Sequence, residues 1–134
     1  MPAFQSLVLT DRQTTPVNHT LTPVGEPRDG VFTVAVADAT GASISEKTVS
    51  INARRVNGKQ KTVEKFTFPT IVNETINGVV VPRVARVGRI TVTTEFEDTH
   101  TIAEKNDAIG MFSSAYQPTK ALIHDTVVKG EGIW

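Results

Sequence analysis

The first hundred residues alternate between apolar and polar positions, and clusters of Gly, Pro, Asp and Asn interrupt this alternation. A period of two residues is typical of β-strands that bury one face. The pattern predicts strands over Phe4–Thr10, Val17–Thr22, Val31–Ala37, Thr48–Val56, Lys61–Phe68 and Val84–Phe96. A loop containing Gly25, Pro27 and Gly30 separates the second strand from the third.

Two Asn-Gly pairs mark turns. Asn57-Gly58 lies between two predicted strands and is the strongest hairpin signal in the chain, because a type I′ two-residue turn needs positive φ at both positions. Asn77-Gly78 lies in a segment bounded by Pro69 and Pro82. Since proline ends most strands, we expect a loop over Thr70–Val81.

Near Thr99 the apolar period becomes helical. Thr101 and Glu104 have the spacing of a capping box, and the apolar residues that follow are Ile102, Ile109, Phe112, Ala115 and Tyr116. A second, shorter helix is predicted around Leu122 and Val127, ending at Gly130. The chain is therefore predicted to be an α+β protein with a β-meander first and two helices last.

The length of 134 residues favours one domain, 1–134, with a β region over 1–98 and a helical tail over 99–134. Six strands about 4.8 Å apart make a sheet roughly 25–29 Å wide. Two helices of about 10 Å diameter, one of them short, cannot cover its apolar face. The pattern thus predicts an intimate dimer, through helices laid over the partner or through sheet edges that continue each other.

Charge is unevenly distributed although the net charge is zero. Residues 47–89 hold nine of the fourteen Lys and Arg side chains and only two carboxylates, Glu64 and Glu74, a local charge of +7. Alternation places many of these cations, with hydroxyl side chains, on one face of the sheet. A basic, hydroxyl-rich face is typical of surfaces that bind polyanions, and RNA is the leading candidate. The competing interpretation is an ordinary solvated sheet face, although such faces usually mix both signs of charge.

Other chemistry finds little support. The three His residues lack ligand spacing, and Cys is absent, so we expect no metal, no cofactor and no catalytic residue. His124 and Asp125 are interpreted as exposed surface. The acids Glu95, Glu97 and Asp98 precede a helix and are explained by its dipole. No apolar run approaches the roughly 18 residues of a membrane span, so no membrane segment is expected.

The order of these elements resembles the coat proteins of single-stranded RNA bacteriophages, the leviviruses. The most specific part is the segment from Pro69 to Pro82 with its Gly-Val-Val-Val-Pro ending, and the Phe4–Leu9 start and the terminal Gly132-Ile133-Trp134 support it. The resemblance implies an N-terminal β-hairpin, a five-stranded antiparallel sheet and two C-terminal helices. It also implies an intertwined dimer with a continuous sheet, which assembles into a T=3 icosahedral shell.

The resemblance assigns roles to particular residues. The loop at the shell's symmetry axes would hold Thr70, Asn73, Glu74, Thr75, Asn77, Gly78 and Pro82. Contacts within the dimer or shell would involve Ile109, Phe112, Tyr116, Leu122 and Trp134. We call the remaining set the polar face, and it would bind RNA through Thr48, Ser50, Asn52, Arg54, Lys61, Val63, Lys65, Arg89, Thr91 and Thr93, with Val31 and Thr33 at its edge. Arg89 stands where relatives offer an aromatic ring for a base to stack on.

The expected function is that of a major capsid protein that packages phage RNA and represses replicase translation through an RNA hairpin. Its partners would be itself, single-stranded phage RNA and a maturation protein, in a virion assembled in the cytoplasm of a bacterial host. One alternative is a small dimeric RNA-binding regulator that forms no shell. Another is an enzyme with a carboxylate site at Glu95–Asp98.

Overall fold

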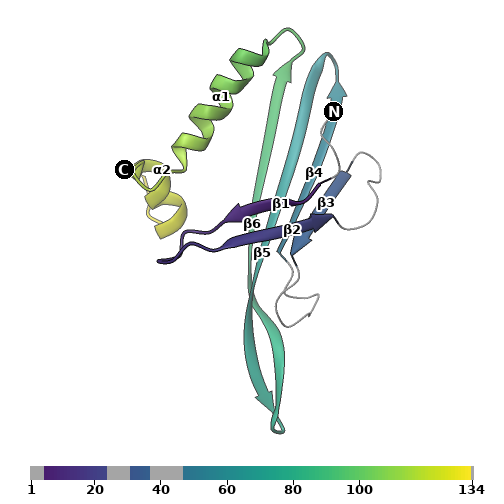
Figure 1. Cartoon of the computed structure of the whole chain (residues 1–134). Coiled ribbons are helices and arrows are strands. Elements are labelled where there is room, and N and C mark those ends of the chain that lie inside the picture. The colour runs from purple at the N-terminus through teal and green to yellow at the C-terminus, as the bar shows by residue number, and fades with distance from the viewer. Residues whose placement is uncertain (1–4, 24–30, 37–46, 134) are drawn as a thin grey trace. The chain divides into compact units, whose positions relative to one another are not determined.

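A computed structural model of the chain describes residues 5–23, 31–36 and 47–133 (Figure 1). The chain divides into two compact units, one ending at Glu95 and the other beginning at Phe96. The expected loop around residues 25–30 and the terminal Trp134 lie outside the described residues. That both units belong to one domain, with a β region over 1–98 and a tail over 99–134, stays a prediction.

Each strand pairs antiparallel with its neighbour in the sequence, in the order β1 to β6. The strands are β1 (Leu7–Thr10), β2 (Asn18–Pro23), β3 (Val31–Val36), β4 (Lys47–Val56), β5 (Lys59–Ile76) and β6 (Val79–Glu97). The first part of β2 pairs with β1, whereas Thr22 and Pro23 pair with β3. The predicted hairpin and the predicted five-stranded sheet, which runs from the end of β2 to β6, are therefore confirmed.

The core of this unit joins the hairpin to one face of the sheet. Leu21 of β2 and Val49 of β4 are each only 1% exposed. The side chains packed against them come from both parts: Leu7, Leu9, Ile51 and Phe66. The hairpin thus covers the apolar face, and the polar side chains of β4 point to the opposite face.

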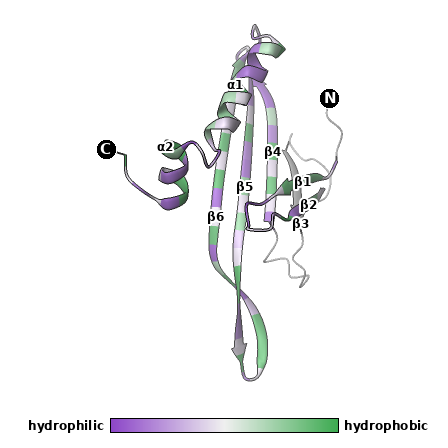
Figure 2. Cartoon of the chain, turned by 60° about the vertical axis from the view of Figure 1, so that its left-hand side comes forward, coloured by the Kyte–Doolittle hydropathy of each residue, from purple (hydrophilic) through white to green (hydrophobic). Residues whose placement is uncertain are grey.

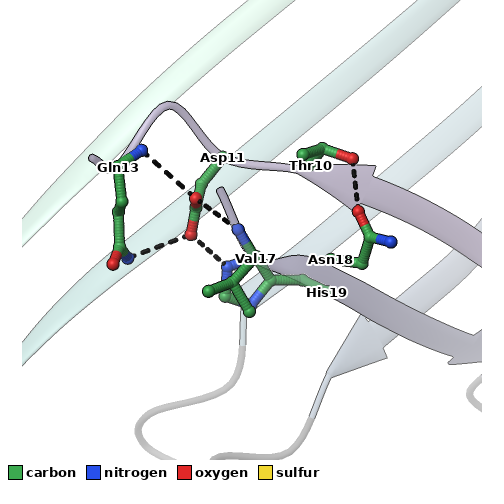
Figure 3. A network of polar contacts seen from close by, with 6 residues as sticks. All are labelled: Thr10, Asp11, Gln13, Val17, Asn18 and His19. Atoms are coloured by element: carbon green, nitrogen blue, oxygen red, sulfur yellow. Dashed lines mark hydrogen bonds and ion pairs between the residues drawn. The ribbon is translucent and has the colours of Figure 1, made fainter. Parts of the chain in front are cut away.

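A carboxylate organises the turn of the N-terminal hairpin (Figure 3). Asp11 accepts hydrogen bonds from the backbone N–H of Val17 at 3.0 Å and from the side chain of Gln13 at 2.9 Å. The Nε2 atom of His19 lies 2.8 Å from the same carboxylate. The Val17 N–H and, after it, His19 hold the pKa of Asp11 below its ordinary value. Sequence reasoning missed this network, because its members are spread along an irregular turn.

The hairpin predicted at Asn57-Gly58 is confirmed. Val56 pairs with Lys59, so the turn contains two residues, and their φ angles are 51° and 74°. Both values lie in the left-handed region, which Asn and Gly adopt most readily.

The loop expected over Thr70–Val81 is wrong, because β5 and β6 continue through it to a two-residue turn at Asn77-Gly78 (Figure 1). Pro69 and Pro82 lie inside strands rather than at their ends. The pairing of β5 with β4 reaches only to Thr67, so no β4 carbonyl needs an N–H from Pro69. β6 is the last strand in the order, and an edge strand tolerates the missing N–H of Pro82.

The second unit holds α1 (Ile102–Ala115), α2 (Ala121–His124) and the π-helical turn η2 (Asp125–Lys129). The predicted capping box is confirmed: Glu104 N–H donates to Thr101 Oγ1 at 3.2 Å, and Thr101 N–H donates to the Glu104 carboxylate at 2.9 Å. The second helix ends at Gly130 as predicted, where φ is 72°. Its final turn is π rather than α, a feature that apolar spacing cannot show.

His124 and Asp125 are half-buried rather than exposed, which corrects the sequence interpretation. His124 Nδ1 lies 3.2 Å from the Asp125 carboxylate, and Lys129 Nζ lies 3.0 Å from it. Hydrogen bonds from Lys129 and, next, His124 lower the pKa of Asp125. The pair therefore stabilises the last helical turn.

Candidate nucleic-acid interface

The strand register brings the predicted polar face together. Positions that lie directly opposite one another across a pair of strands point to the same face. Across β4 and β5 the rows are Asn52 with Val63, Ser50 with Lys65, and Thr48 with Thr67. In β3 the backbone partners of Asn52, Ser50 and Thr48 are Val31, Thr33 and Ala35. Five of the predicted residues therefore form two adjoining rows and the start of a third.

A further row contains only cations. Arg54 lies directly opposite Lys61, two residues along β4 from Asn52. The two-residue turn at Asn57-Gly58 produces this alignment, because each residue inserted or removed there would move one strand's side chains to the other face. Arg54 thus belongs to the polar face.

Two contacts place β6 on the same surface. A Cβ added to Gly88 would lie 4.0 Å from Cβ of Phe68, which alternates along β5 with the polar-face residues. Glu95 lies beside Arg54 and Lys61 at the other end of β6. Gly88 therefore points to the apolar face and Glu95 to the polar face. Alternation between them assigns the predicted residues of β6 to the polar face: Arg89, Thr91 and Thr93.

The cations of the polar face are largely unneutralised. Arg54, Lys65 and Arg89 are exposed, and Lys61 is half-buried. Among the residues that the structure describes, no ion pair joins any of these four to a carboxylate. Every buried side-chain polar atom in the described part has a hydrogen-bond partner, so no unsatisfied side-chain polar group is buried there. Positive charge is thus displayed to solvent on this face.

Two residues of this surface were not predicted. Lys59 lies at the start of β5, and its Nζ is 3.5 Å from Oε1 of Glu95. Both line one hollow with Arg54, Val56, Asn57 and Lys61, which we call the corner hollow. The position of Glu95 was explained by the helix dipole, but its ion pair is with Lys59 on the neighbouring strand β5, so that explanation is wrong for this contact. Lys59 and Lys61 are two residues apart on β5, so alternation places both side chains on the same face. The sequence could therefore have predicted Lys59, given the length of the turn.

This arrangement suits a phosphate-rich ligand. Lys and Arg side chains neutralise phosphates, and the hydroxyl and amide groups of Ser50, Thr91 and Asn52 can donate to or accept from bases and sugars. Within the described ranges, no group of three His, Asp or Glu side chains could hold a metal ion. None of the described helices is long and apolar enough to cross a membrane.

The far end of the β5–β6 hairpin presents apolar side chains to solvent, and Figure 2 colours much of this stretch hydrophobic. The exposed residues are Val72, Ile76, Val79, Val80 and Val81. Arg83 joins Glu74 at 2.7 Å across the two strands near this end. All the residues assigned to the symmetry-axis segment lie in this hairpin: Thr70, Asn73, Glu74, Thr75, Asn77, Gly78 and Pro82.

The helical unit also exposes the residues predicted to make subunit contacts. Ile109 and Phe112 are each 42% exposed, Tyr116 is 41% exposed, and Leu122 is 69% exposed. The Phe112 and Tyr116 rings meet edge to face, with centroids 5.2 Å apart. No residue of α1, α2 or η2 is buried. Exposed apolar helix surfaces of this kind are typical of protein–protein contact sites.

Known coat and capsid proteins match this chain over nearly its whole length. A family model described as levivirus coat protein matches residues 2–134. The capsid protein of Pseudomonas phage PRR1 is 36% identical over 132 residues, which cover 98% of each chain.

Solved structures share the fold. The virus-like particle of bacteriophage NT-214 is 23% identical, with a TM-score of 0.80 over 97% of this chain and 98% of that chain. The capsid protein of bacteriophage GA is 20% identical, with a TM-score of 0.79 over 97% of each chain. With the hairpin, five-stranded sheet and two helices in place and the sequence matched from end to end, this chain belongs to the levivirus coat protein family.

Proposed function

We propose that this coat protein packages phage RNA on its polar face and builds an icosahedral shell from homodimers. The observation that carries the RNA assignment is the run of cations in register, with Arg54 opposite Lys61 and Lys65 one row beyond Val63. Like charges placed directly opposite each other destabilise a sheet. A polyanion that neutralises them offsets this cost, so the arrangement favours an RNA ligand.

The rest of the face provides the contacts that RNA recognition needs. The hydroxyl groups of Thr48, Ser50, Thr91 and Thr93 lie among the cations, and Asn52 adds an amide. The guanidinium plane of Arg89 can stack on an unpaired base in place of an aromatic ring. These features support binding of a hairpin whose loop bases are splayed out, and through such a hairpin the protein would repress replicase translation.

Two unsatisfied surfaces support the proposed homodimer. β6 is an edge strand, and its Ile90 side chain is 48% exposed. Pairing of β6 with β6 of a second copy would satisfy the backbone groups of this edge and make one continuous sheet. The apolar residues of α1 and α2 would be covered in the same dimer. The substitution Leu122→Asp, which introduces a charge, should therefore prevent assembly and yield monomers or aggregates by light scattering, whereas Lys120→Asp should assemble like wild type.

For the shell, we assign the far end of the β5–β6 hairpin to contacts around the symmetry axes. Its exposed valines form an apolar patch of the kind that marks interaction sites, and contacts between hairpins would bury them. Trp134 is assigned to a contact between subunits. The complete virion, a T=3 particle assembled in the bacterial cytoplasm, would also contain a maturation protein.

Electron microscopy of the protein purified from a bacterial host, with absorbance at 260 and 280 nm on the same fraction, tests this function. Uniform round particles rich in nucleic acid are expected. Particles without nucleic acid would overturn the RNA assignment and leave the shell. A soluble dimer that binds RNA without forming particles would overturn the shell and identify a dimeric regulator.

A further inference from the structure

One carboxylate stands among the cations of the polar face. Glu95 is the single acidic residue that lines the corner hollow, together with Arg54, Lys59 and Lys61. Its Oε1 lies 3.5 Å from Lys59 Nζ. None of the polar-face residues predicted from the sequence is acidic.

We propose that Glu95 competes with RNA phosphate for the cations of the corner hollow. A carboxylate and a phosphate oxygen are both anionic acceptors, and they seek the same ammonium and guanidinium donors. The competitor is attached to the protein, so it is always present at the hollow. Lys59 is fully available to a phosphate only after this ion pair opens. This inference rests on the proposed RNA-binding function and identifies a residue that tunes it.

The geometry makes the displacement feasible. The side chains of Lys59 and Glu95 are 46% and 51% exposed, so water screens their attraction and the pair is weak. A weak pair opens at little cost when a stronger anion enters. While it is closed, it reduces repulsion in a region where Arg54 already faces Lys61. Glu95 therefore stabilises the free protein slightly and weakens its hold on RNA.

The test compares Glu95→Gln with wild type, using a fluorescently labelled oligouridylate whose anisotropy is followed across a range of salt concentrations. We expect Glu95→Gln to bind about two- to fivefold more tightly, as removal of one exposed ion-pair competitor implies. Its salt slope should steepen by about 0.7, because one more phosphate is neutralised on a single strand.

The matched control is Glu64→Gln. Glu64 is in β5 opposite Ile51, on the apolar face, and its substitution changes the net charge of the protein by the same amount. Glu64 and the corner hollow lie on opposite faces of the sheet, so this variant should change binding much less. Equal gains in affinity from Glu64→Gln and Glu95→Gln would overturn the proposal.

Lys59→Ala provides the second arm. If Glu95 holds Lys59 away from RNA, Lys59→Ala should cost little affinity in wild type and more in the Glu95→Gln background. Equal costs in both backgrounds would overturn the competition. Folded wild-type protein that binds no oligouridylate would instead overturn the proposed function, and the inference with it.

Discussion

Arg54 and Lys61 lie directly opposite each other across the β4–β5 pair, with the corner hollow beside them. Two cations in this position repel, and each would be better placed opposite an acid if stability alone mattered. The apolar face of the same strands shows no such conflict, since Val49 lies opposite Phe66. The conflict is confined to the face that we assign to RNA.

Removal of cations from the polar face should reduce RNA binding. For the triple variant Lys61→Ala, Lys65→Ala and Arg89→Ala, we expect a lower ratio of absorbance at 260 to 280 nm in purified particles. The salt slope for a single-stranded oligonucleotide should fall by about 2, at about 0.7 for each phosphate that the variant no longer neutralises.

A charge-matched triple variant controls for net charge: Arg12→Ala, Arg55→Ala and Arg86→Ala. Arg12 lies in the turn of the N-terminal hairpin. Arg55 of β4 and Arg86 of β6 lie at positions that alternate with those of the polar face. If both triple variants package equally reduced amounts of RNA, binding is set by total charge and the assignment of this face is wrong.

Substitution of the core should lower stability. Val49 is 1% exposed and packs in the core that joins the sheet to the N-terminal hairpin, so Val49→Ala should lower the free energy of unfolding by about 2 kcal/mol. Val8→Ala, at a position 55% exposed, should change it by less than about 0.5 kcal/mol. Urea denaturation followed by circular dichroism measures both, and similar decreases would contradict the core described above.

Acid should destabilise the N-terminal hairpin. Because the pKa of Asp11 is lower in the folded protein than in the unfolded chain, its carboxylate stabilises the fold above the unfolded pKa of about 3.9. This contribution is lost as the pH falls through the folded pKa. The thermal midpoint of Asp11→Asn should therefore be below that of wild type at pH 7, and the difference should shrink below about pH 4.

Asp107→Asn is the control for this effect, since the Asp107 side chain makes no hydrogen bond or ion pair within the described part of the chain. Its midpoint should follow that of wild type at every pH. A difference between Asp11→Asn and wild type that stays constant down to about pH 3, below the unfolded pKa, would show that the carboxylate network is not the cause.

A charge at the far end of the β5–β6 hairpin should block the shell and spare the dimer. Val80 is 61% exposed, so Val80→Asp introduces a carboxylate without disturbing the core. We expect size-exclusion chromatography to show RNA-binding dimers in place of particles. Val8→Asp, at a similarly exposed position outside this hairpin, should still give particles.

The sequence by itself determined the classes and the order of the elements. Alternation and the Asn57-Gly58 turn predicted the strands of the sheet, and the spacing of Thr101 and Glu104 predicted the start of α1. These signals are local: a turn needs residues that tolerate positive φ, and a helix start needs acceptors for its free N–H groups.

Only the tertiary structure decided which residues meet across strands. Pro69 and Pro82 suggested a loop, yet they stay in strands because β5 has no β4 neighbour beyond Thr67 and β6 lies at the edge. The contact of Lys59 with Glu95 joins residues far apart in the sequence and depends on the register of β6 against β5. Register is a property of paired strands, so one strand's alternation predicts its faces but not the partners that those faces meet.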